Sequence, residues 1–150
     1  MHSKRKGNIG QFAVAHKLAE YGFSVFTEEG DISKIDLIAE KDCEIIRMQV
    51  KSITPVNNSL IIKFTKSGPN YHFKYNKNMF DYFAIYDLVN KDIYLLKNDI
   101  MDINNLTMTI RLKPTKNKQT RHIRYAEEFL ADNVLSKLIG SSGIEPESEN

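Results

Sequence analysis

A carboxylate, an amide and an ammonium group lie close together in this sequence, on Asp36, Gln49 and Lys51. The segments that carry them have strand composition, and a turn is expected between them at residues 42–43. Paired positions of an antiparallel hairpin lie at equal distances from the turn, so Asp36 is expected directly across from Gln49. Gln49 and Lys51 are two residues apart, so their side chains leave the same face of the strand.

These groups together suit a divalent cation and a phosphate. Polar groups on a strand are costly to bury unless they pair or bind something. Mg²⁺ takes oxygen ligands from one or two side chains and completes its shell with water and substrate phosphate. It would polarise the phosphate and acidify a water, which Lys51 would orient, or Lys51 would stabilise the charge that develops on the phosphate. The alternative is a surface hairpin with an Asp36–Lys51 ion pair and a solvated Gln49, because such pairs are common.

The elements that must position this site follow the order helix, strands, helix. Residues 8–21 repeat apolar side chains at helical spacing, with Asn8 as the expected N-cap and Gly22 as the expected stop. A second helix is expected at residues 125–139. This order predicts an α/β fold with a mixed β-sheet flanked by helices. The expected strands are residues 23–27, 35–40, 44–51, 59–65, 71–75, 80–88 and 92–96.

Length and composition indicate one ordinary globular domain. The chain has 150 residues, of which 41% are hydrophobic and 27% charged, and its formal net charge is +2. Cys43 is the only cysteine, which excludes an internal disulfide and favours a reducing compartment. We expect no signal peptide and no membrane span, and therefore a cytoplasmic protein. Residues 1–139 are expected to form the domain, and the polar, acidic residues 140–150 a disordered tail.

Two segments have a basic character that suits contact with DNA. Residues 111–124 hold six Lys or Arg and no acid, and residues 63–77 interleave lysines with aromatic residues on an expected hairpin. Neutralised phosphates release counterions, and a two-stranded ribbon fits the major groove. The alternative is a charged edge that protects the sheet from aggregation. The expected DNA-binding residues are Lys63, Lys66, Asn70, His72, Lys74, Lys77, Arg111, Lys113, Lys116, Lys118, Arg121 and Arg124.

The order of the site residues resembles the PD-(D/E)xK endonuclease superfamily. Asp-Leu-Ile at residues 36–38 and Gln-Val-Lys at residues 49–51 are similar to its motif, in the branch that ends the motif with Q-V-K. That branch includes intron-encoded bacterial homing endonucleases, and the likeness extends over residues 7–96. It implies a restriction-endonuclease-like core. It also implies hydrolysis of double-stranded DNA with Mg²⁺, or with another divalent cation such as Mn²⁺ or Ca²⁺.

The resemblance also implies roles for single residues. Asp36 corresponds to a metal ligand, and Lys51 to the catalytic lysine. Gln49 stands where most relatives have Glu or Asp, and Val50 would offer its backbone carbonyl to the metal. The expected catalytic residues are Gln11, Asp36, Gln49 and Lys51, and the expected metal ligands are Asp36, Gln49 and Val50.

Gln11 departs from the family pattern, which has a Glu in the first helix within a run like G-x-x-G-E. Asp36 is then the single side-chain carboxylate expected at the metal, which predicts weak metal binding and impaired cleavage. Gln11 is interpreted either as an engineered, inactivating replacement of that Glu or as the partner of Asn8 in a capping box.

Cleavage of both DNA strands needs two active sites, which favours a homodimer whose two-fold symmetry matches a pseudo-palindromic target. A long target favours a dimer of dimers. Residues 80–96 and 125–139 offer apolar faces for such contacts, unless these faces belong to the core. Two other functions remain open: a structure-specific nuclease such as a junction resolvase, and a catalytically dead domain that binds DNA or RNA.

Overall fold

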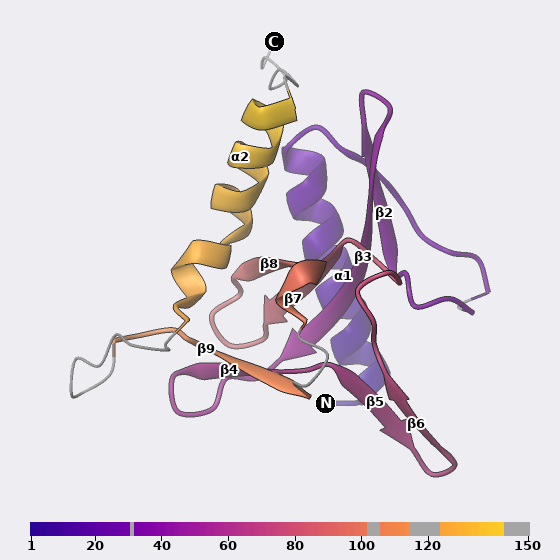
Figure 1. The fold of residues 1–150 in the computed structure, drawn as a ribbon, viewed down its shortest axis with the longest axis vertical. Coiled ribbons are helices and arrows are strands. Elements are labelled where there is room, and N and C mark those ends of the chain that lie inside the picture. The colour runs from indigo at the N-terminus through magenta and orange to yellow at the C-terminus, as the bar shows by residue number, and fades with distance from the viewer. Residues whose placement is uncertain (31, 102–105, 115–123, 143–150) are drawn as a thin grey trace.

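The computed structural model of the chain describes residues 1–30, 32–101, 106–114 and 124–142 (Figure 1). The first and last elements are α-helices, α1 (Ser3–Glu20) and α2 (Ala131–Ser142). The strands are β1 (Ser24–Phe26), β2 (Leu37–Lys41), β3 (Glu44–Ile53), β4 (Ser59–Lys63), β5 (Thr65–Gly68), β6 (Tyr71–Lys74), β7 (Tyr82–Asp87), β8 (Ile93–Lys97) and β9 (Thr107–Arg111). Two short 3-10 helices are also present: η1 (Asn98–Ile100) lies between β8 and β9, and η2 (Ala126–Phe129) lies between β9 and α2.

A five-stranded sheet of order β1-β2-β3-β7-β8 forms the centre of the fold. β3 and β7 run parallel, whereas the other neighbours in this sheet are antiparallel, so the sheet is mixed. α1 and α2 pack against one face of it. The ribbon formed by β4 and β9 packs against the other face. The predicted mixed sheet flanked by helices is therefore confirmed.

The core has two parts because successive side chains of a strand point to opposite faces of the sheet. On β7, Ala84 and Tyr86 face the helices, whereas Phe83 and Ile85 face the β4–β9 ribbon. Burial on both faces explains why this strand is almost continuously apolar. The apolar residues of β7, β8 and α2 are thus core residues. Val134 and Leu138 of α2 are only partly buried, so this helix keeps some apolar surface outside the core.

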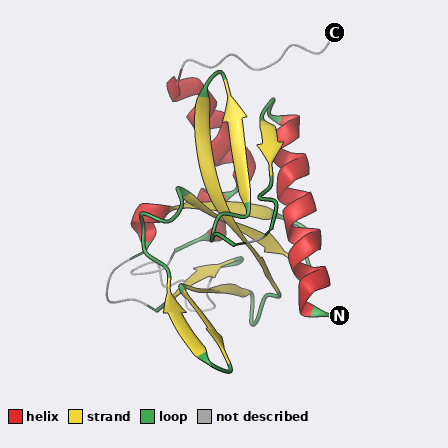
Figure 2. Ribbon diagram, turned by 90° about the vertical axis from the view of Figure 1, so that its right-hand side faces the viewer, coloured by secondary structure: helices red, strands yellow, loops and turns green. Residues whose placement is uncertain are grey.

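The basic segment around residue 70 forms a hairpin of its own. β5 pairs with β6 in the register Gly68↔Tyr71 to Thr65↔Lys74, and the hairpin projects from the lower end of the molecule in Figures 1 and 2. The turn predicted around Pro69-Asn70 is confirmed, and every strand predicted from the sequence is present, with ends shifted by a few residues. β5 and β9 were not predicted as separate strands.

The first helix begins earlier than its apolar pattern predicts. α1 starts at Ser3, and the N-cap is His2, whose Nδ1 accepts a hydrogen bond from the main-chain N–H of Lys4 at 3.2 Å. Asn8 is therefore an exposed residue inside the helix, and the predicted N-cap and capping box with Gln11 are wrong. Gly22, at φ 86°, lies just past the last turn as predicted.

The second predicted helix is divided at Leu130. Leu130 has a non-helical backbone, with φ −52° and ψ 132°, and forms an isolated bridge with Tyr94 of β8, so η2 ends before it and α2 begins after it. α2 continues through Gly140 to Ser142, which places the first residues of the predicted tail in the helix. Residues 143–150 lie outside the described part of the chain. None of the helices described is long and apolar enough to cross a membrane.

Candidate active site

A tight turn sets the register of the β2–β3 hairpin. Asp42 and Cys43 occupy the left-handed region at φ 49° and 70°, which is the conformation of a two-residue turn that matches the twist of its strands. The pairs run from Lys41↔Glu44 to Leu37↔Met48. Continued by one residue, this register puts Asp36 opposite Gln49, as the position of the turn predicts.

Asp36 lies just before the first residue of β2 and contacts β3 on both sides of Gln49. Its main-chain N–H donates to the carbonyl of Met48 at 2.8 Å. Its Oδ2 accepts a hydrogen bond from the main-chain N–H of Val50 at 2.8 Å. Because the carboxylate accepts a hydrogen bond from the backbone of β3, it is oriented beside the Gln49 position.

Gln49 is only partly buried, but its Oε1 is buried and has no hydrogen-bond partner among the described residues. Its Nε2 lies 3.5 Å from the carbonyl oxygen of Val50, at the limit of a hydrogen bond. A buried acceptor without a partner costs about 1–3 kcal/mol. This oxygen is not solvated, which argues against a simple surface hairpin. Gln49 Oε1, the Asp36 carboxylate and the Val50 carbonyl are all oxygen donors, the ligand type that a hard divalent cation prefers.

The ammonium group of Lys51 is held by the opposite layer of the fold. Its Nζ donates to the main-chain carbonyl of Lys63 on β4 at 2.6 Å. It lies over the aromatic rings of Tyr75 and Phe83, 4.9 Å and 5.6 Å from their centroids. These contacts fix the position of the amine and leave it little freedom to move toward another site.

Burial lowers the pKa of Lys51 from 10.5 to about 8, and the charges of Lys66 and Lys63 contribute in the same direction. The carboxylate of Asp36 acts in the opposite direction. A lysine with this pKa is still mostly protonated at neutral pH, but it releases its proton far more readily than an exposed lysine. It can therefore stabilise negative charge or take part in proton transfer.

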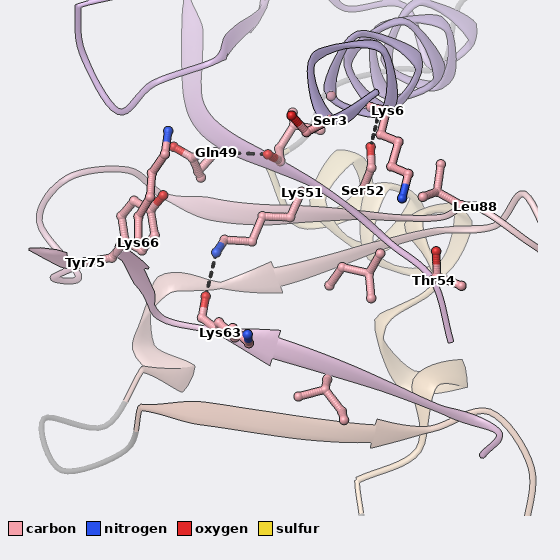
Figure 3. Close-up of a pocket in the computed structure, with 14 residues that line it drawn as sticks. Ser3, Lys6, Gln49, Lys51, Ser52, Thr54, Lys63, Lys66, Tyr75 and Leu88 are labelled. Carbon is pink, nitrogen blue, oxygen red and sulfur yellow. Dashed lines mark hydrogen bonds between the residues drawn. The ribbon is translucent and has the colours of Figure 1, made fainter. Parts of the chain in front are cut away.

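A cavity of about 520 Å³ opens beside these residues (Figure 3). Its floor is the end of β3 from Gln49 onward, and its walls come from the start of α1 and from β4. Four lysines line it, and no Asp or Glu is among the described residues that do. The lysines are Lys6, Lys51, Lys63 and Lys66. The cavity is thus strongly basic.

Asp36 lines a second, smaller hollow of about 230 Å³, together with Glu28 of the preceding loop. Glu28 accepts hydrogen bonds from the main-chain N–H groups of Ile32 and Ser33, at 3.1 Å and 2.9 Å, so its carboxylate closes this loop. The described residues contain no group of three or more His, Cys, Asp or Glu that could hold a metal. A cation beside Asp36 would therefore not be held by three or more such side chains from the described residues.

Gln11 is partly buried on α1 and lines neither hollow. The start of α1 also contributes to the site, since Ser3, Lys6 and Gly7 line the basic cavity. The sequence did not predict this contribution. The basic run at residues 4–6 was the available signal. It lacks an apolar repeat, so the pattern gave no reason to place it on a helix.

The predicted DNA-binding residues fall into separate groups. Lys66, Asn70 and His72 are exposed on the β5–β6 hairpin, where Nδ1 of His72 lies 2.7 Å from Oγ of Ser67. Lys63 and Lys77 are also exposed, whereas Lys74 is partly buried. This hairpin therefore presents polar and basic side chains to solvent, as a DNA-contacting ribbon requires.

The second basic segment is only partly described. Arg111 is partly buried, with Nη1 3.4 Å from Oγ of Ser59, and Arg124 forms an ion pair with Glu128 at 3.0 Å. Both arginines thus have partners within the fold, and Lys113 is exposed. The remaining predicted residues, Lys116, Lys118 and Arg121, lie outside the described part of the chain.

Comparison with known proteins identifies the family. No curated protein sequence matches the chain. Among solved structures, a bacterial homing endonuclease, I-Ssp6803I, superposes with a TM-score of 0.74 at 22% identity, over 97% of this chain and 99% of that one. MepB superposes with a TM-score of 0.36 at 14% identity, over 81% and 87% of the two chains, which is too low to indicate a shared fold. The fold is thus restriction-endonuclease-like, as predicted. A sequence profile of PD-(D/E)XK endonucleases matches residues 1–132, and the chain therefore belongs to the PD-(D/E)XK endonuclease family.

Proposed function

We propose that this chain is a divalent-metal-dependent endonuclease that hydrolyses phosphodiester bonds of double-stranded DNA. The observation that carries the proposal is the buried Oε1 of Gln49, which lacks a partner among the described residues and belongs to a residue that lines the basic cavity and stands opposite Asp36 in the hairpin register. An oxygen donor set beside a concentration of positive charge suits a cation and a phosphate bound together.

Asp36, Gln49 and the main-chain carbonyl of Val50 would hold the cation, with Mg²⁺ as the expected ion. When bound, it supplies Lewis acidity to the scissile phosphate. Asp36 brings the single carboxylate of this set, so we expect weaker binding than at a site with two or more carboxylates. The hydrogen bond from Val50 to Asp36 supports the proposal because it orients the carboxylate before any metal binds.

Lys51 would act on the phosphate from the cavity side. In the hydrolysis a water oxygen bonds to phosphorus and an ester P–O bond breaks, which leaves one phosphate monoester and one hydroxyl end. The ammonium group of Lys51 would stabilise the negative charge that grows on the phosphate oxygens. Its pKa of about 8 also suits transfer of a proton to or from the reacting groups.

The solved homing endonuclease of the same fold supports cleavage at specific sites that produces a double-strand break. The exposed side chains of the β5–β6 hairpin are the candidates for reading bases in the major groove. One domain offers one site, so an even number of copies is required to cut both strands, in a dimer or tetramer. A junction resolvase is the second candidate, and it would cut four-way junctions regardless of sequence.

The test is cleavage of a plasmid and genomic-fragment library by the wild-type chain, Gln11→Glu and Lys51→Met, with Mg²⁺, with Mn²⁺ and with EDTA. We expect the wild-type chain and Gln11→Glu to make discrete double-strand breaks that require the metal. Lys51→Met should make none. Cleavage restricted to four-way junctions would replace site-specific cutting with the resolvase function. DNA binding by all three proteins without cleavage by any of them would reject the nuclease proposal in favour of a binding domain.

A further inference from the structure

Two consecutive residues of β3 tie the two walls of the basic cavity to the strand that carries the site. The Nζ of Lys51 donates to the main-chain carbonyl of Lys63, at 2.6 Å, on the β4 side. The Oγ of Ser52 donates to the main-chain carbonyl of Lys6, at 2.7 Å, on the α1 side. Figure 3 shows the two bonds leaving β3 in opposite directions. Each wall is therefore anchored at a lysine whose side chain lines the same cavity.

The α1 wall lies unusually close to β3. A Cβ at Gly10 would stand 2.1 Å from Oγ of Ser52, so only glycine allows this approach without displacing the hydroxyl. Gly10 is buried, and Lys6 lies one helical turn before it. The close packing thus fixes the start of α1, and with it the amine-bearing chain of Lys6, relative to Lys51.

The floor of the cavity is longer than one phosphate needs. It runs from Gln49 on β3 to Thr54 just after the strand, which is about 16 Å at roughly 3.3 Å per residue. Successive phosphates of one DNA strand are separated by roughly 3.4 Å along the helix axis. The part beyond Lys51, flanked by Lys6 and Lys63, therefore has room for a phosphate other than the one at the cation site.

The lysines of this cavity are not balanced by any Asp or Glu among the described residues that line it. Lys6 and Lys63 do not form an ion pair with an Asp or Glu among the described residues, and Lys66 and Lys63 both repel the charge of Lys51. Lysines that gather in a concave site without carboxylates attract anions from solution. The polyanion that an endonuclease binds in every turnover is the phosphate backbone of DNA.

We propose that Lys6 and Lys63 form a subsite for a DNA backbone phosphate, separate from the scissile phosphate held near Lys51. The choice of DNA as the ligand of this subsite rests on the proposed function, whereas the binding test below does not require cleavage. The two amines bind the DNA backbone from opposite walls and orient the DNA strand along β3. Lys6 is thereby a DNA-binding residue on α1, and Lys63 acts together with it across the cavity.

The experiment measures binding of a fluorescent random-sequence duplex by anisotropy, in EDTA, over a series of salt concentrations. The proteins are the wild type, Lys6→Gln, Lys63→Gln and the double variant. Lys137→Gln on α2 is the matched control, because it removes the same charge from an exposed helix position that does not line the cavity. Thermal unfolding of each protein identifies any variant that fails to fold.

Each cavity variant is expected to lower the slope of log affinity against log salt by about 0.9 and to weaken binding roughly five- to tenfold. The control is expected to keep the wild-type slope. The double variant is expected to lose less affinity than the product of the two single losses, because both lysines bind the same phosphate. Affinity and slope unchanged in Lys6→Gln and Lys63→Gln would overturn the subsite, and so would an equal loss in Lys137→Gln.

Cleavage separates the subsite from the proposed function. Lys6→Gln should raise the KM for DNA by a larger factor than it lowers the rate at saturating DNA, whereas Lys51→Met should not cut at any concentration. If the wild type binds DNA with the lysine dependence above but never cuts, the subsite stands and the proposed function falls. If Lys6→Gln lowers the rate at saturation as much as Lys51→Met does, the separation of the two phosphates is wrong.

Discussion

The carboxylate of Asp36 accepts a hydrogen bond from the main-chain N–H of Val50, with 2.8 Å between Oδ2 and the nitrogen. This bond connects the residue that precedes β2 to the middle of the Gln49–Lys51 segment. It has a structural role, because it satisfies a backbone donor, and it orients a charge at the proposed cation site. The two roles can be separated because an amide retains the acceptor oxygen and removes the charge.

Asp36→Asn is therefore expected to preserve the fold and abolish cleavage. The Asn Oδ1 can accept the Val50 N–H, so the free energy of unfolding should change by less than about 1 kcal/mol. Asp36→Ala leaves this donor without its acceptor, and it should lose about 1–3 kcal/mol as well as cleavage. Urea unfolding and plasmid cleavage measure the two effects. Equal stability of the two variants would show that the hydrogen bond contributes nothing.

Gln49 offers a test of the cation site that does not require cleavage. Gln49→Leu removes a buried acceptor that has no partner in the described part of the chain, so the metal-free protein should gain about 1 kcal/mol of stability. It should also lose any rise in Tm that Mg²⁺ or Mn²⁺ produces in the wild type.

Gln49→Glu adds a carboxylate to the same position, and the opposite pair of changes is expected. The metal-free protein should be less stable, because a partly buried charge lacks a partner, and the rise in Tm with Mg²⁺ should be larger than in the wild type. A rise in Tm of the same size in Gln49→Leu, Gln49→Glu and the wild type would mean that the cation binds elsewhere.

The register of the β2–β3 hairpin was predictable because it is a local property. A two-residue turn at Asp42-Cys43 fixes every pair up to Leu37↔Met48, and this places Asp36 beside Gln49. The same holds for the β5–β6 hairpin, whose turn signal lies at Pro69-Asn70. Sequence reasoning works here because the turn and its two strands are adjacent in the chain.

The parts that could not be predicted depend on contacts between distant segments. β9 has few residues, and its partner β4 lies more than forty residues earlier, so neither strand signals the pairing. The start of α1 has no apolar repeat, and it is held by the approach of Gly10 to Ser52. Tertiary packing alone also buries the Gln49 Oε1 and places the Lys51 amine over the Tyr75 ring.

The lowered pKa of Lys51 should make the free energy of unfolding depend on pH in the alkaline range. Its pKa is about 8 in the folded protein and 10.5 as the ordinary value. Below pH 8 Lys51 is protonated in both the folded protein and the unfolded chain. Between these two values the unfolded chain holds the proton and the folded protein does not, so stability rises with pH by at most about 3 kcal/mol. This gain is lost again as the pH falls through 8.

The measurement is urea unfolding of the wild type and Lys51→Met from pH 7 to pH 10.5. Other groups titrate in both proteins, so the quantity of interest is the difference between their free energies of unfolding. That difference should move in favour of the wild type as the pH rises. A difference that is constant with pH would contradict a lowered pKa for Lys51.

Gly10 and Ser52 should be energetically coupled. A Cβ on Gly10 would displace the Ser52 hydroxyl from the Lys6 carbonyl, at a cost of about 1 kcal/mol, and would improve helix propensity by about 1 kcal/mol. Gly10→Ala alone should therefore be nearly neutral. In a Ser52→Ala background the same change should stabilise the protein by about 1 kcal/mol. Urea unfolding of the four proteins gives the coupling energy, and strictly additive effects would refute it.

Gln11→Glu tests the departure from the family pattern. The family resemblance puts a Glu at this position, and a second carboxylate near Asp36 should strengthen binding of a divalent cation and raise the rate of cleavage. The structure leaves Gln11 partly buried on α1 but outside both hollows, so the gain requires the new carboxylate to reach the Asp36 side of the sheet.

The comparison is between Gln11→Glu and Asn8→Asp, which adds the same charge to α1 at an exposed position. Cleavage rates at several Mg²⁺ concentrations should rise for Gln11→Glu and stay at the wild-type level for Asn8→Asp. The half-saturating Mg²⁺ concentration should also fall only for Gln11→Glu. If both variants change by the same amount, the charge acts at long range on DNA or metal, and Gln11 is not the position of a missing ligand.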